Sequence, residues 1–296
     1  KCFRQAIKIK SDYSEAYNNL GKLLIEINNK TEAENCFYSA IKLNPDFAEA
    51  YNSLGVLFLE KKHALHKLKA ESFFIKSIHL NPKSFDACNN LGNLYHSQKL
   101  FHKAEEYFKK AINVNPKFSE ALKNYGNLLK ERNRLNEAEK LYLQALKYKP
   151  NFLSVIYSLA DICHQNSRFK EAEKYYKPVG NQNIEKNTVQ YLKSLLFQQN
   201  IDKSISFLDS VITELNPNRI LFNYLLEIHD LLISNYVDGT KDDKLALKLF
   251  FNAESLIYQN KNSEALSILE KIFSQHPDAL IRPLSSLRLA ILLTEF

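Results

Sequence analysis

Hydrogen-bonding side chains recur at one spacing in the first half of the chain, in a pattern suited to recognition rather than catalysis. Asparagine or serine stands two residues before a glycine or alanine at Asn19, Ser53, Asn90, Asn124 and Ser158. A second set, one residue after that glycine or alanine, comprises Lys22, Val56, Asn93, Asn127 and Asp161. A side-chain amide offers both donors and an acceptor. A column of amides on one helix face can therefore hydrogen-bond the backbone of an extended peptide without reading much of its sequence.

These polar residues have a second interpretation, in which they only solvate the helix face. Asparagine ranks low as a helix former, and its repetition at one helical position favours the peptide-binding interpretation. The candidate peptide-binding residues are Asn19, Ser53, Asn90, Asn93, Asn124, Asn127 and Ser158.

Catalytic and metal chemistry finds little support in the sequence. No glycine-rich phosphate loop, H-E-x-x-H or G-x-S-x-G motif is present. His63 and His66 are three residues apart, which suits a metal ion, but no nearby residue completes a site. His96 and His164 occupy equivalent places two repeats apart, which favours a groove-lining role. We expect no catalytic residue, no metal site and no cofactor, and hence a chain that is not an enzyme.

The four cysteines are Cys2, Cys36, Cys88 and Cys163, and none forms a C-x-x-C pair. Free cysteine behaves as a small hydrophobic residue, so we expect buried thiols rather than zinc or redox chemistry. Wide spacing in a helical chain predicts the cytoplasm or another reducing compartment.

Composition favours long helices joined by short loops. The 296 residues include only 6 glycines and 8 prolines, too few for the turns of hairpins and barrels. Apolar residues make up 45% and charged residues 25%, which is typical of a folded soluble chain. No apolar run approaches the roughly 18 residues that suggest a membrane span, so we expect no membrane contact.

The net charge of +7 is unevenly distributed. Residues 51–200 contain 24 Lys and Arg against 13 Asp and Glu, whereas residues 201–296 contain 9 against 13. A basic middle could attract acidic partners, including nucleic acid. The aromatic residues lie mostly at core positions rather than among exposed Lys and Arg, which argues against nucleic-acid binding. A solvated outer face is the favoured explanation.

Three residue classes repeat in phase with a period of 34 or 37 residues. The glycines of the series are Gly21, Gly55, Gly92 and Gly126, and Ala160 continues it. The prolines are Pro45, Pro82, Pro116 and Pro150. The alanines are Ala33, Ala70, Ala104, Ala138 and Ala172, each followed four residues later by an aromatic residue. Each unit therefore predicts two helices, with the glycine in the first, the alanine in the second, and proline as the stop signal.

This unit resembles the tetratricopeptide repeat, a pair of antiparallel helices of 34 residues. Residues 17–21 (YNNLG) match the family pattern, as do Ala33, Phe37, Ala40 and Pro45. The resemblance covers residues 1–178 and implies an all-α, right-handed superhelix that binds proteins or peptides on the concave face of its first helices. Small residues would then let paired helices approach closely.

The asparagine column is similar to the one in the repeat arm of O-linked N-acetylglucosamine transferase, which recruits protein substrates in its groove. The resemblance implies the same role for Asn19, Asn90 and Asn124, with interruptions at Ser53 and Ser158. A carboxylate-gripping site is disfavoured, because Glu15, Glu49, Asp86 and Glu120 place acidic groups where such a site needs Lys or Arg.

We predict three regions along the chain. Residues 1–12 form the second helix of a truncated repeat, since residues 2–12 align with 36–46, and at least one further repeat is expected upstream. Residues 13–178 form a regular array of about five repeats, and residues 179–296 form degenerate repeats with a closing helix from residue 280. The favoured function is a noncatalytic interaction scaffold, and the alternative is the substrate-recruiting arm of a larger enzyme such as a nucleotide-sugar glycosyltransferase.

Overall fold

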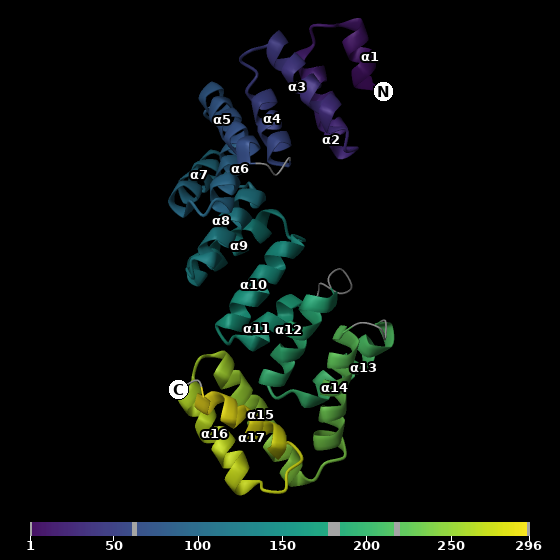
Figure 1. Cartoon of the computed structure of the whole chain (residues 1–296), viewed down its shortest axis with the longest axis vertical. Coiled ribbons are helices and arrows are strands. Elements are labelled where there is room, and N and C mark those ends of the chain that lie inside the picture. The colour runs from purple at the N-terminus through teal and green to yellow at the C-terminus, as the bar shows by residue number, and fades with distance from the viewer. Residues whose placement is uncertain (1, 61–63, 177–183, 216–219, 295–296) are drawn as a thin grey trace. The chain divides into compact units, whose positions relative to one another are not determined.

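The computed structural model describes residues 2–60, 64–176, 184–215 and 220–294 (Figure 1). Within these residues there are seventeen α-helices, one π-helical segment and no strand, which confirms the predicted all-α fold. None of these helices is both long and apolar enough to cross a lipid bilayer. The chain divides into two compact units, residues 1–155 and 156–296, which we describe separately.

The first unit consists of helices that pack in pairs. They are α1 (Cys2–Ile9), α2 (Ser14–Glu26), α3 (Lys30–Leu43), α4 (Ala48–Glu60), α5 (Ala64–Leu80), α6 (Phe85–Ser97), α7 (Phe101–Val114), α8 (Ser119–Glu131) and α9 (Leu135–Tyr148). The pairs are α2 with α3, α4 with α5, α6 with α7, and α8 with α9. Each second helix ends two residues before its proline. The stop follows because proline disfavours the helical conformation of the residue before it.

Each repeated glycine lies against the aromatic ring of the paired helix. A Cβ atom added to Gly21 would lie 2.5 Å from Cε1 of Phe37, and one added to Gly126 would lie 2.5 Å from Cε1 of Tyr142. A Cβ on Gly92 would lie 2.7 Å from two ring carbons of Phe108. Real Cβ atoms do not approach so closely, so only glycine permits this helix–helix distance. The predicted close approach of the paired helices is confirmed.

Successive first helices also contact one another. The contacts join α2 to α4, α4 to α6, and α6 to α8, and they are more extensive than those between successive second helices. The first helices therefore lie on the inner side of the stack in residues 1–155. The side chains between them are the ones that the sequence singles out as a candidate binding column.

The second unit continues the helical packing with less regular pairs. Its helices are α10 (Leu153–Gln165), α11 (Phe169–Tyr176), α12 (Ile184–Phe197), α13 (Ile201–Glu214), α14 (Ile220–Leu232), the π-helical segment η2 (Ile233–Val237), α15 (Lys241–Tyr258), α16 (Asn262–Gln275) and α17 (Arg282–Thr294). The helix α10 begins three residues before the boundary of the unit. Ala253 and Ala265, which continue the repeat spacing, are fully buried.

The helix α15 begins at Lys241, inside the polar stretch DGTKDD of residues 238–243. Thr240 and Asp243 form a capping box, in which each side chain bonds to the backbone N–H of the other residue. Such a box satisfies the free N–H groups at the start of a helix. Asp243 also accepts a hydrogen bond of 2.9 Å from the backbone of Leu280, and these bonds lower the pKa of its carboxyl group.

The prediction of buried cysteines is confirmed for three of the four and is wrong for Cys2. Cys36, Cys88 and Cys163 are covered by helix packing, and Cys2 is exposed. Burial raises the pKa of the Cys36 and Cys88 thiols. Because the thiolate is the reactive form, these two cysteines are packing residues.

Candidate functional site

The asparagine and serine column lies on successive first helices. Asn19 is on α2, Ser53 on α4, Asn90 on α6, Asn124 on α8 and Ser158 on α10. Asn19, Asn90, Asn124 and Ser158 are half-buried, while Ser53 is buried. Ser158 belongs to the second unit, so the geometry described below concerns the first four residues.

Two amides of the column bond to the repeat before them. The Asn90 side chain donates a hydrogen bond of 3.0 Å to the amide oxygen of Asn52, and the Asn124 side chain donates one of 2.9 Å to Asn89. Asn52 and Asn89 are each three residues before a repeat glycine. The column therefore links neighbouring repeats, a role that the sequence reading missed. Each donor amide keeps a second N–H and its oxygen.

The series of amide–amide hydrogen bonds between neighbouring repeats is interrupted where serine replaces asparagine. Asn18 occupies the acceptor position equivalent to Asn52 and Asn89, and the residue that would donate to it is Ser53. Asn18 is only 1% exposed, and among the described residues neither atom of its amide has a hydrogen-bond partner. A serine side chain is too short to replace the amide that Asn90 and Asn124 supply. The amide–amide bond between repeats is therefore absent at Ser53 among the described residues.

The second column makes different bonds. The Tyr142 hydroxyl donates a hydrogen bond of 2.7 Å to Asn127, within one helix pair. Tyr176 donates one of 3.0 Å to Asp161 in the same way. The other three repeats have phenylalanine at this aromatic position and Lys22, Val56 or Asn93 opposite. In both repeats whose aromatic residue is a tyrosine, the residue opposite accepts a hydrogen bond from the tyrosine hydroxyl.

Two candidate residues remain available to a ligand. The half-buried amides of Asn19 and Asn93 have no hydrogen-bond partner in the part of the chain that the structure describes. Lys22, by contrast, is paired with Glu49 on the next first helix. The first helices of this unit thus carry both amides used in packing and amides without a partner among the described residues.

Acidic groups line the beginning of the first helices. Partial burial raises the pKa of Asp86, Lys22 opposes this rise, and the charges of Glu49 and Glu120 add to it. The electrostatic coupling of Asp86 to Glu49 and Glu120 shows that the acidic groups of three repeats lie close together. A carboxylate ligand would be repelled there, in line with the sequence argument against a carboxylate-gripping site.

His96 and His164 lie in different surroundings, although they occupy equivalent positions in their repeats. No group of three His, Cys, Asp or Glu residues that could hold a metal occurs in the described ranges, and His63 lies outside them. His96 is half-buried, with Nε2 2.7 Å from an oxygen of Glu131. His164 is only 1% exposed, and its ring packs against Phe169 and Tyr258. The groove-lining role expected for His164 is therefore wrong, because aromatic side chains enclose the ring.

Family comparisons agree with this geometry. Sequence profiles described as tetratricopeptide repeat match residues 14–47, 85–118, 107–140 and 124–177. The chain contains tetratricopeptide repeats. No curated protein sequence matches it.

Solved structures with similar folds support the same conclusion about architecture. A structure described as the functional characterization of Pseudomonas aeruginosa pilF is 20% identical, covers 73% of this chain and 97% of its own, and has a TM-score of 0.62. The Cut9–Hcn1 hetero-tetramer of APC/C is 14% identical, covers 77% of this chain and 45% of its own, and has a TM-score of 0.60. At these identities the likeness shows the repeat fold alone.

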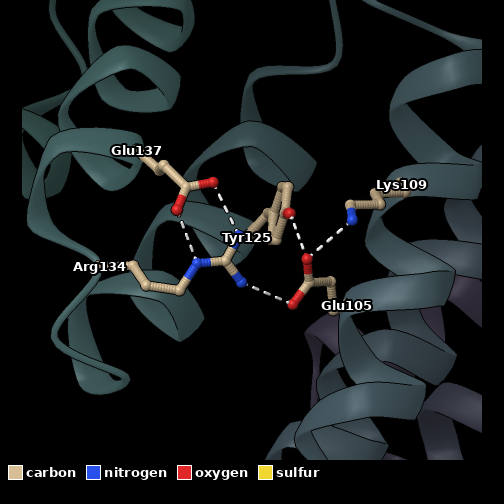
Figure 2. A network of polar contacts seen from close by, with 5 residues as sticks. All are labelled: Glu105, Lys109, Tyr125, Arg134 and Glu137. Atoms are coloured by element: carbon tan, nitrogen blue, oxygen red, sulfur yellow. Dashed lines mark hydrogen bonds and ion pairs between the residues drawn. The ribbon is translucent and has the colours of Figure 1, made fainter.

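A carboxylate joins two of these tetratricopeptide repeats (Figure 2). Glu105 on α7 accepts a hydrogen bond of 2.8 Å from the Tyr125 hydroxyl on α8 and is paired with Lys109 at 2.8 Å. Its other oxygen accepts a hydrogen bond of 2.9 Å from Arg134. The Arg134 guanidinium also donates two hydrogen bonds of 2.7 Å to the carboxylate of Glu137. The network holds α7 against the next helix pair.

The network also sets the charge of Glu105. Partial burial favours the neutral acid, but hydrogen bonds from Lys109 and Tyr125, together with the charge of Arg134, lower its pKa to about 2. Because the pKa is lower than the unfolded value of about 4.3, the group stabilises the fold above that pH. This contribution is lost as the pH falls toward 2.

Replacing Glu105 with glutamine is expected to lower the free energy of unfolding by about 1 kcal/mol at pH 7, since the pair is partly solvated. Urea unfolding at pH 7 and pH 3 measures the effect, and the difference between wild type and variant should shrink at pH 3. Glu106→Gln is the matched control, because Glu106 is exposed and its ion-pair partner among the described residues is Lys110 on its own helix. Equal effects of the two substitutions would contradict an inter-repeat role for Glu105.

Proposed function

We propose that this chain is a noncatalytic interaction scaffold that binds extended segments of partner proteins along the inner side of its first helices. The observation that supports it is the pair of free, half-buried amides, Asn19 and Asn93, on that inner side. A bound backbone would supply the donors and acceptors that these amides lack within the chain. The amides of Asn90, Asn124 and Asn127 keep hydrogen-bonding capacity beyond their internal bonds and belong to the proposed surface. Ser53 is buried and Ser158 belongs to the second unit, so neither is part of it.

The tetratricopeptide repeats support a protein ligand, since solenoids of stacked helix pairs offer extended concave surfaces for binding. The acidic groups near Asp86 would favour a peptide with positive charge at that end of the helices. Neither nucleic acid nor a membrane is part of the proposal.

Substitution of Asn93 with alanine tests the proposal. Proteins captured by the full chain are identified first, and the affinity of a peptide from the captured region is then measured by calorimetry. Asn93→Ala should weaken binding about tenfold, which corresponds to one lost hydrogen bond with an unsatisfied partner. The same substitution at Asn113, an exposed residue of α7, serves as the control. Equal affinities of the wild type and Asn93→Ala would reject the column as a binding surface.

A second proposal is that the scaffold is part of a larger enzyme. The resemblance of its asparagine column to the repeat arm of O-linked N-acetylglucosamine transferase suggests a substrate-recruiting arm of a larger glycosyltransferase. The sequence of the full-length gene product distinguishes the two, since a fused catalytic domain supports the second proposal and its absence removes it.

A further inference from the structure

The second unit contains an open apolar cavity of about 540 Å³, separate from the column in residues 1–155. Side chains of α12, α14, α15 and α17 line it. These four helices are drawn in green to yellow in Figure 1. Its lining is mostly aliphatic and aromatic, unlike the amide and carboxylate groups on the first helices of the other unit. The two surfaces therefore suit different ligands.

Two apolar ridges face the cavity, one on α14 and one on α17. They are Tyr224, Ile228 and Leu231 on α14, and Leu284, Leu287 and Ile291 on α17. Within each ridge the residues are three or four positions apart, so they share one helix face. Seven residues of helix extend about 10 Å, or two turns. The groove between the ridges is therefore about two turns long.

The ridges are unusually exposed for such large apolar side chains. Leu287 is 59% exposed, and Tyr224 is 40% exposed. A pocket for a small molecule normally encloses most of its ligand, whereas this groove is open along one side. Exposed apolar patches of this kind mark protein interaction sites.

The hydrogen bonds that a ligand's backbone needs favour a helical partner over an extended one. An extended strand lying on these apolar walls would bury peptide N–H and C=O groups with few partners, which is unfavourable. A helix satisfies its backbone groups internally and presents only side chains. Helical segments with apolar residues at i, i+3 or i+4 and i+7 bind in grooves of this type.

The charges in the groove define the partner further. Arg288 is neutralised by Glu254, with Nε 2.6 Å from a carboxylate oxygen. Lys193, which also lines the cavity, has no ion-pair partner among the described residues. The groove thus has one uncompensated positive charge, and an acidic residue on the partner would complement it.

We propose that the groove between α14 and α17 binds an amphipathic α-helix of a partner protein, whose apolar face contacts both ridges and whose acidic side chain pairs with Lys193. This site is independent of the extended-peptide surface in the first unit. Its occupant differs from that of the first unit in conformation and in charge.

Selection of peptides on the full chain tests the proposal. The probe is a phage-displayed random library of peptides about 15 residues long, near the length at which isolated helices become stable. Enriched sequences are expected to place apolar residues at i, i+3 or i+4 and i+7 with an Asp or Glu on a flank. They should gain helical circular dichroism when they bind.

Variants of the chain then locate the site. Leu287→Asp should weaken the selected peptide about 30-fold, because it places a charge in the middle of a ridge. Leu293→Asp is the matched control, since Leu293 is on the same helix and 56% exposed but does not line the cavity. Lys193→Gln should weaken binding about fivefold at low salt and remove most of its salt dependence.

Four outcomes would overturn the proposal. These are a failure to enrich any peptide, enrichment of proline-containing extended sequences, equal effects of Leu287→Asp and Leu293→Asp, and an unchanged affinity in Lys193→Gln. Two others would assign the groove to a different occupant and equally reject the helix. One is a concentration-dependent dimer abolished by Leu287→Asp, and the other is an acyl ligand seen by native mass spectrometry of the purified chain.

Discussion

Replacing Gly92 with leucine is expected to lower the free energy of unfolding by about 3 kcal/mol or more. The reason is steric, since even a Cβ atom at this position would lie 2.7 Å from Cδ1 and Cε1 of Phe108. Phe108 is fully buried and cannot swing into solvent. Overpacking of a tight core typically costs about 1–3 kcal/mol, and a leucine adds three further carbons to the clash.

The sign of this effect distinguishes packing from helix propensity. Glycine in a helix is about 1 kcal/mol less favourable than alanine or leucine, so propensity alone predicts a more stable variant. A decrease in stability would show that the contact between α6 and α7 outweighs propensity. Urea unfolding followed by circular dichroism measures the change.

A double-mutant cycle with Phe108→Ala tests the cause. Removal of the ring opens space beside Gly92, so leucine should be tolerated better in that background than in the wild type. We expect a coupling of about 2 kcal/mol between the two sites, within the range seen for residues in contact. Additive effects would contradict the proposed clash between residue 92 and the ring. Asn113→Leu, at an exposed position of α7, is the control for added apolar surface.

The sequence predicts the helix pairs well because backbone chemistry leaves little choice at the repeated positions. Pro116 cannot lie in a helix interior, so it stops the second helix of its repeat, and Gly92 lies so close to the Phe108 ring that a Cβ atom would clash with it. Such constraints act within one repeat and are visible as a spacing. The family and the all-α fold follow from them.

The contacts between repeats are harder to predict. Asn90 has the spacing of a ligand-binding amide, yet it donates to Asn52 on the preceding repeat. A spacing places a side chain on a helix face but does not give its distance from the next helix. The same limit hides Glu105, whose partner Tyr125 lies on a different repeat.

Irregular packing explains the remaining differences. His96 and His164 occupy equivalent positions in the sequence, yet only His164 is enclosed. One enclosing residue, Tyr258, comes from a helix far along the chain, so no local pattern indicates it. The groove in the second unit is hidden for a similar reason. The sequence pattern indicates the apolar faces of α14 and α17. It does not indicate that these faces stay exposed, because exposure depends on tertiary packing.

Acidification from pH 7 to pH 4 is expected to destabilise the second unit through His164, by about 3 kcal/mol. Its ring centroid lies 5.2 Å from that of Phe169, 5.7 Å from that of Phe197 and 4.6 Å from that of Tyr258. Neither ring nitrogen has a hydrogen-bond partner in the described ranges. Burial, with the nearby charge of Lys193, lowers the pKa to about 4, and Asp161 opposes this shift only in part.

The sign follows from proton binding. In the unfolded chain a histidine has a pKa of about 6.5. Between that value and about 4 the unfolded chain binds a proton that the folded chain excludes. Stability is therefore complete above pH 6.5 and falls as the pH decreases toward 4. The difference in pKa corresponds to about 3 kcal/mol at 1.36 kcal/mol per unit.

His164→Phe is expected to remove this pH dependence and to raise stability at pH 7, because a phenyl ring fills the aromatic cluster without two unpaired nitrogens. Hydrogen exchange of the α10 amides at several pH values reports opening of this unit, and a proton NMR titration reports the folded-state pKa of His164 directly. His79→Phe is the control, since His79 is exposed on α5. The carboxylates other than Asp161, which is coupled to His164, contribute equally in both variants, so the difference between them reports His164 and its interaction with Asp161. A folded-state titration of His164 near pH 6.5, or an unchanged pH slope in His164→Phe, would show that solvent reaches the ring.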